Sequence, residues 1–163
     1  NIIRMPDALF NMEAFEKANK IYVLQEYLYH YQKNDFAICQ RYSKDTINYY
    51  ETYIELVKKY IKKYHKNEKF IDTLNIKIVT SIDKYMYNYF FHKDNPQKDI
   101  ENEFKELLNK ELYIDAMKNV KIKYLSLYQR LVLKNAKKKK ILILKLLKGV
   151  KGNLKKIKHR RML

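Results

Sequence analysis

Apolar side chains recur at spacings of three and four along most of this chain, a pattern typical of helices with one buried face. The clearest run predicts a helix over roughly 44–66, because apolar residues follow one face without a miss and Lys58, Lys59, Lys62, Lys63 and Lys66 lie largely off that face. That stripe consists of Ile47, Tyr50, Ile54, Val57, Ile61 and Tyr64. A second helix is predicted over roughly 69–92, and the short link around Asn67 predicts that it runs antiparallel to the first.

Two further starts precede apolar patterns of the same kind. Met5-Pro6-Asp7 is a favourable helix beginning, since proline and an acid suit the first turn, and it predicts a helix over roughly 7–33. Asp94-Asn95-Pro96 has the same features, with Asn95 as the cap and Pro96 at the first helical position. The pattern after it indicates a helix from 97 to about 135, either continuous or broken near Asn119.

The C-terminal residues repeat the helical spacing with lysines between the apolar positions. The stripe there consists of Ile143, Leu147, Val150, Leu154 and Ile157. Gly149 and Gly152 lie inside it, and each costs a helix about 1 kcal/mol relative to alanine. We therefore expect a helical body over 1–135 and a basic, partly helical extension over 136–163, whose helix beyond residue 148 needs a partner.

Composition supports an all-α fold. The chain has 163 residues, enough for one domain, and only 2 glycines and 2 prolines, which leaves little material for hairpin turns. Apolar residues make up 47% of the chain, so a real core is expected. The fold class predicted is a compact all-α bundle of about 4–5 amphipathic helices with the basic C-terminal extension.

The positive charge is concentrated at the C-terminal end. The net charge is +17, and the stretch from Lys118 to the end holds 17 lysines and arginines without a single acid. Heavy use of lysine, isoleucine, tyrosine and asparagine indicates an AT-rich genome, but such a bias does not by itself exclude acidic residues. The acid-free stretch therefore requires a partner or a solvated surface as its explanation.

Catalytic signals are absent from the sequence. Gly149 and Gly152 do not have the spacing of a phosphate-binding loop, and the four histidines lie in separate segments. Cys39 is the single cysteine and is expected to be a small core residue. The acids between Asp94 and Asp115 suit a helix start, where the dipole favours them. We expect no enzyme, no cofactor, no metal site and no small-molecule substrate.

Three partners would explain the basic C-terminal third. RNA phosphates release counterions when lysines bind them, whatever the sequence. An anionic membrane surface binds basic amphipathic helices, although no segment here is long and apolar enough to span a bilayer. The third explanation is an acidic protein or plain solvent, and a DNA-binding helix-turn-helix also stays open. The residues expected to contact nucleic acid are Lys134, Lys137, Lys138, Lys139, Lys140, Lys145, Lys148, Lys151, Lys155, Lys156, Lys158, Arg160 and Arg161.

In composition and layout, a helical body with a lysine-rich, acid-free extension, the chain resembles ribosomal proteins, although it matches no ribosomal family's motif. The AT-biased composition and the start at Asn1 suit an organellar, mitochondrial-type ribosome, with a cytoplasmic or nuclear location as the other expectation. The resemblance implies rRNA as the partner, with neighbouring proteins on tyrosine-rich helix faces such as 85–89. The alternative is a membrane-peripheral or scaffold subunit of an organellar complex whose tail lies on anionic lipid.

Overall fold

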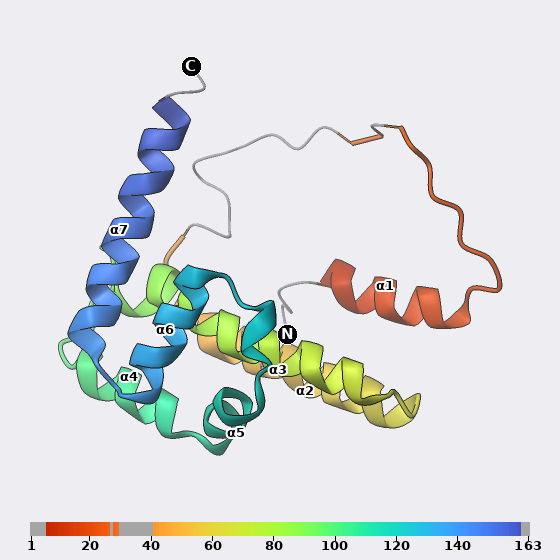
Figure 1. Ribbon diagram of the computed structural model, residues 1–163, viewed down its shortest axis with the longest axis horizontal. Helices are drawn as coiled ribbons and strands as arrows, with labels where there is room; N and C mark the ends of the chain where they lie inside the picture. The colour runs from red at the N-terminus through yellow and green to blue at the C-terminus, as the bar shows by residue number, and fades with distance from the viewer. Residues whose placement is uncertain (1–5, 27, 30–40, 161–163) are drawn as a thin grey trace.

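The computed structural model describes residues 6–26, 28–29 and 41–160, with side chains described over 7–26, 28–29 and 41–152 (Figure 1). All regular structure in these ranges is helical, which confirms the predicted all-α class. The same ranges contain seven α-helices, more than the four or five expected. They are α1 (Pro6–Lys17), α2 (Thr46–Lys63), α3 (Glu68–Tyr85), α4 (Ile100–Asn109), α5 (Glu111–Asn119), α6 (Leu127–Lys137) and α7 (Ile141–Arg160).

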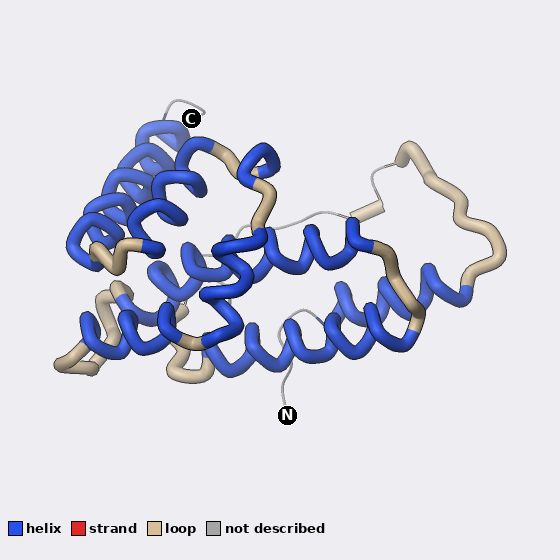
Figure 2. Tube along the Cα trace, turned by 60° about the horizontal axis from the view of Figure 1, so that its bottom comes forward, coloured by secondary structure: helices blue, strands red, loops and turns tan. Residues whose placement is uncertain are grey.

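Helices α2 and α3 form the antiparallel pair that the sequence predicts (Figure 2). The chain reverses at His65, which has a left-handed φ of 47°. Asn67 then caps α3, because its side-chain oxygen accepts a hydrogen bond from the Lys69 amide at 3.1 Å. Ile54 of α2 and Ile82 of α3 are fully buried, so the predicted stripes face the core.

A π-helical turn, Met86–Phe90, ends α3, and the expected role of Asn95 after it is wrong. Helix α4 begins at Ile100, with Asp99 rather than Asn95 as its cap residue. The Asn95 amide instead donates to the carbonyls of Tyr89 at 3.0 Å and Phe90 at 3.3 Å. Asn95 therefore caps the end of the preceding helix, because the last carbonyls of a helix have no hydrogen-bond donor within it.

The segment 97–135 is not one continuous helix. It breaks after Asn119, as the second alternative predicts, and also at Lys110, which the sequence pattern does not predict, so it contains α4, α5 and α6. Lys110 adopts an extended backbone, with ψ of 137°, between α4 and α5. A 3₁₀ turn, Ile122–Tyr124, follows α5. Ser126 and Gln129 then form a capping box that starts α6. This Ser-x-x-Gln pattern is the sequence signal that predicts a new helix start at α6, after the break that follows α5.

The N-terminal helix is much shorter than the predicted 7–33. It ends at Lys17, and residues 18–26 are not helical. Ile21, Leu24 and Leu28, which belong to the apolar stripe that predicts a longer helix, are exposed, so this part of the stripe packs on no other surface. Without that packing, β-branched residues give a helix little support. Positions 27 and 30–33, and Cys39, lie outside the described residues.

The core joins the last helix to the rest of the body. Tyr85, Phe104 and Tyr113 are fully buried and bring α3, α4 and α5 together. Ile141 and Leu144 of α7 belong to the same apolar cluster. Helix α7 contacts α4, α6 and the π-helical turn. The first turns of the basic C-terminal segment are therefore part of the folded body.

Candidate nucleic-acid interface

The turn between α6 and α7 carries the four consecutive lysines 137–140. Lys139 adopts a left-handed conformation with φ of 51°. Its amide bonds to the Ala136 carbonyl at 3.0 Å, and the Lys140 amide bonds to the Asn135 carbonyl at 3.0 Å. The lysines thus surround the carboxyl end of α6, where the helix dipole favours cations and offsets part of their mutual repulsion.

Most lysines near this turn are exposed and have no carboxylate partner in the described part of the chain. Five of them form no salt bridge within the described residues: Lys134, Lys137, Lys138, Lys140 and Lys145. Lys139 is also exposed and donates to the side-chain oxygen of Asn109, a neutral group. We call Lys134, Lys137–Lys140 and Lys145 the α6–α7 lysine surface. Its charges face solvent and are available to a polyanion.

Two of the predicted contact residues are instead used inside the protein. The Lys148 ammonium donates to the Phe91 carbonyl at 2.9 Å, and the Tyr87 hydroxyl donates to the Lys148 carbonyl at 2.9 Å. Lys151 forms an ion pair with Asp83, which also accepts a hydrogen bond from Tyr128 at 2.8 Å. Burial raises the pKa of Tyr87 to about 12. Lys148 and Lys151 therefore fix α7 to α3 and the π-helical turn.

The remaining predicted residues lie at the end of the chain. Lys155, Lys156, Lys158 and Arg160 fall on the last turns of α7, whose backbone stays helical through both glycines. Their side chains, and Arg161 entirely, lie outside the described part. Figure 1 shows the C-terminal turns of α7 extending past α6.

A shallow cleft of about 380 Å³ adjoins the lysine surface. Its apolar wall includes Leu108, Ile114 and Met117, with Ala136 on the α6 side. Lys118, Lys137 and Lys139 also line it. Lys118 is absent from the predicted contact residues, although it begins the acid-free stretch that could have indicated it. Ammonium groups beside an apolar wall suit a phosphate that carries an apolar or planar group.

Helix α7 has a second apolar face, which points to solvent. Leu142 is 67% exposed and Leu146 69%, and Val150 is exposed beside them. Ile141 and Leu144 pack inward instead, so the buried face is rotated away from the expected Ile143–Leu147–Val150 stripe. Apolar residues surround much of this helix, and spacing alone does not determine which side packs.

The tyrosine-rich segments also differ in exposure. Tyr85 and Tyr89 are buried in the core, so the 85–89 face offers them to no partner. Tyr22 and Tyr29 are exposed on a segment that is not helical, and Tyr27 and Tyr31 lie outside the described residues.

Within the described residues, no cluster of three or more His, Cys, Asp or Glu side chains is arranged to hold a metal ion. None of the described helices has the length and apolarity to cross a membrane. No protein-family model, curated protein or solved structure matches this chain.

Proposed function

We propose that this protein is a non-catalytic RNA-binding component of a large ribonucleoprotein, of the organellar-ribosome type, and that the α6–α7 lysine surface contacts rRNA phosphates. The observation that carries the proposal is the set of exposed lysines at the α6–α7 turn that have no carboxylate partner among the described residues. Each lysine placed on a phosphate releases condensed counterions, and this gain does not depend on base sequence.

The geometry suits a phosphate backbone. Helix α7 has 20 residues, so its backbone extends about 30 Å from the α6–α7 turn. Lys148 and Lys151 hold that helix against the body, so the lysines at its start are presented from a fixed position. Positioned cations lose less conformational freedom on binding than cations on a free tail.

Substitution tests this better than truncation after residue 135, because truncation would remove Ile141 and Leu144 from the core. We would compare K137Q/K138Q/K140Q with K44Q/K84Q/K98Q, which removes the same charge from exposed lysines elsewhere. The first variant should bind a structured RNA more weakly, and the slope of log affinity against log salt should fall by about 2 to 3. The proposal would be contradicted if both variants lost the same RNA affinity, or if RNA affinity did not depend on salt concentration.

The exposed apolar face of α7 favours a second candidate, binding to an anionic membrane surface. Leu142, Leu146 and Val150 form an apolar strip on a basic helix, which is the pattern of interfacial helices. L142S/L146S should then reduce binding to vesicles containing phosphatidylserine and leave RNA binding unchanged. If L142S/L146S binds these vesicles as well as the unmodified chain does, membrane binding through this face of α7 is excluded.

A further inference from the structure

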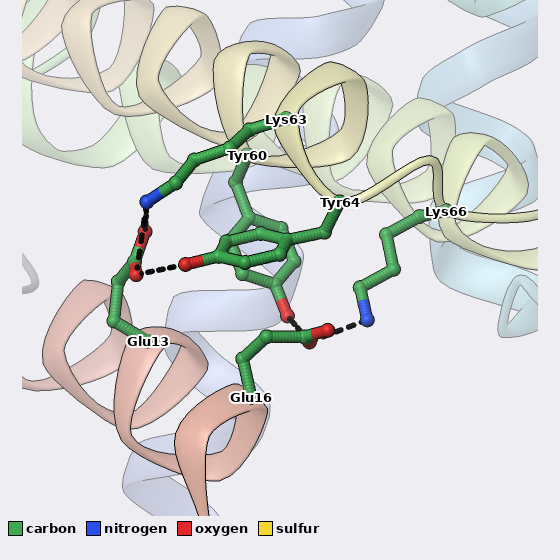
Figure 3. A network of polar contacts seen from close by, with 6 residues as sticks. All are labelled: Glu13, Glu16, Tyr60, Lys63, Tyr64 and Lys66. Atoms are coloured by element: carbon green, nitrogen blue, oxygen red, sulfur yellow. Dashed lines mark hydrogen bonds and ion pairs between the residues drawn. The ribbon is translucent and has the colours of Figure 1, made fainter.

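Helix α1 is attached to α2 through two acid-centred contacts (Figure 3). The Glu13 carboxylate accepts a hydrogen bond from the Tyr64 hydroxyl at 2.6 Å and contacts the Lys63 ammonium at 3.4 Å. The Glu16 carboxylate accepts from the Tyr60 hydroxyl at 2.6 Å and forms an ion pair with Lys66. Each acid of α1 therefore contacts one phenol and one ammonium from the end of α2 or the link that follows it.

The groups beneath these acids form a surface of alternating rings and cations. The Lys63 ammonium lies 4.5 Å from the centroid of the Tyr64 ring, and Lys66 lies 5.2 Å from that of Phe70. The rings of Tyr60 and Tyr64 are 4.9 Å apart. Aromatic rings that stack on bases, interleaved with lysines that bind phosphates, are typical of surfaces for single-stranded nucleic acid.

The two carboxylates occupy the positions that phosphate oxygens would take on such a surface. A phosphodiester oxygen accepts hydrogen bonds from a phenol and an ammonium just as a carboxylate does. Hydrogen bonds from Tyr64 and Lys63 lower the pKa of Glu13, and those from Lys66 and Tyr60 lower the pKa of Glu16, so both acids are held in their anionic form.

Helix α1 does not pack fully against α2. A cleft of about 340 Å³ remains beside it, lined by Leu9 and Met12 of α1 and Leu56 and Lys59 of α2 among others. Phe10 and Phe15, on the other side of α1, are exposed. The segment that follows, 18–26, is not helical. Displacing α1 therefore breaks the two acid-centred contacts and the contacts that the partly buried Ala8, Leu9 and Met12 make with the core.

We propose that α1 covers a second RNA-binding surface, formed by Tyr60, Lys63, Tyr64, Lys66 and Phe70, and that a single-stranded RNA segment displaces Glu13 and Glu16 from it. The choice of RNA as ligand rests on the proposed function. The surface itself is separate from the α6–α7 lysines and is tested separately.

The first measurement compares E13Q/E16Q with E101Q/E106Q, which removes two exposed acids of α4 and changes the net charge equally. With a labelled oligouridylate as probe, E13Q/E16Q should raise affinity roughly tenfold more than the control, because apparent affinity scales with the fraction of molecules whose surface is uncovered. Adding K63Q/K66Q to E13Q/E16Q should abolish the gain. A gain no larger than the control, or one that survives K63Q/K66Q, would overturn the inference.

The second measurement uses the unmodified chain and avoids any effect of substitution on folding. Hydrogen exchange of the α1 amides should accelerate when saturating oligouridylate is added, while α3 stays protected. Unchanged α1 exchange at saturation would also overturn the inference.

The same assays in a K137Q/K138Q/K140Q background distinguish the proposed function of the α6–α7 lysine surface from the proposed surface under α1. If E13Q/E16Q still raises the affinity for oligouridylate in that background, and K63Q/K66Q still abolishes the gain, the result supports the covered surface independently of the α6–α7 lysine surface. If all binding disappears with those three substitutions and α1 exchange never changes, the proposed function stands and this inference fails. A chain that binds no RNA in any form overturns both.

Discussion

Lys151 of α7 forms an ion pair with Asp83 of α3, so one of the lysines in the basic C-terminal third holds that third to the body. Both side chains are partly shielded, and Tyr128 also donates to Asp83. We expect Asp83→Asn to lower the free energy of unfolding by about 1 to 3 kcal/mol, since it weakens charge-assisted hydrogen bonds. Urea unfolding measures this.

Lys138→Gln is the matched control, because Lys138 is exposed and without a salt bridge in the described structure. It should leave stability within about 0.5 kcal/mol and weaken RNA binding. Loss of stability in Lys138→Gln equal to that in Asp83→Asn would contradict the division of the lysines into internal and available groups.

Two leucines of α7 provide a second prediction, about which face of the helix packs. Leu144 is fully buried, whereas Leu142, two positions earlier, is 67% exposed. Leu144→Ala should cost about 2 to 5 kcal/mol of stability, because it leaves a cavity in the core. Leu142→Ala should change stability by about 0.5 kcal/mol or less. Equal urea midpoints for the two variants would show that α7 packs by another face.

The hydrophobic pattern predicts α2 and α3 well because each has one long apolar face that packs into the core. It fails where an apolar stripe finds no surface, as at Ile21 to Leu24, and where polar residues serve the preceding helix, as Asn95 does. Local spacing carries no information about which of two apolar faces the rest of the chain will cover. For α7 that choice depends on the position of α6 and the π-helical turn.

The candidate site is predictable only as a region. Charge counting indicates the basic C-terminal third, but Lys138 and Lys151 are equivalent in that count, and only the fold gives Lys151 its partner, Asp83. The contacts of Glu13 and Glu16 with α2 join residues far apart in sequence, and no local motif marks them. Sequence composition therefore indicates the charge, and tertiary structure determines which charges are free.

The acids of α1 provide a third prediction, on pH. Both carboxyls have a pKa below the ordinary value of 4.5, and for Glu13 the largest cause is the hydrogen bond from Tyr64. Because the pKa of each carboxyl is lowered, the free energy that it contributes to the attachment of α1 to α2 is fully present above pH 4.5. This contribution is lost as the pH falls through the lowered pKa values. NMR titration of the side-chain carboxyl carbons measures both groups.

Tyr64→Phe makes the titration specific, because it should raise the pKa of Glu13 toward 4.5 and leave the pKa of Glu16 lowered by Lys66. A Glu13 midpoint that is the same with and without the Tyr64 hydroxyl would contradict the contact in Figure 3.

A buried pair of tyrosines gives the last prediction, at alkaline pH. The hydroxyl oxygens of Tyr85 and Tyr113 lie 3.0 Å apart, and Tyr113 donates to Glu51 at 3.1 Å. Burial raises the pKa of Tyr85 from 10.0 to about 12, and burial with the neighbouring Tyr85 raises the pKa of Tyr113 further. The unfolded chain therefore loses these protons first, and stability falls as the pH rises above 10.0.

Each of the two tyrosines should contribute a slope of about 1.4 kcal/mol per pH unit to the loss above that pH. Urea unfolding at several pH values between 10.0 and about 12 measures the slope, and phenolate absorbance in this range should show these tyrosines ionising as the chain unfolds. Tyr85→Phe should reduce the slope by one tyrosine's share, whereas Tyr124→Phe removes an exposed ring and serves as the control. An unchanged slope in Tyr85→Phe would mean that this hydroxyl is not protected from ionisation by the core.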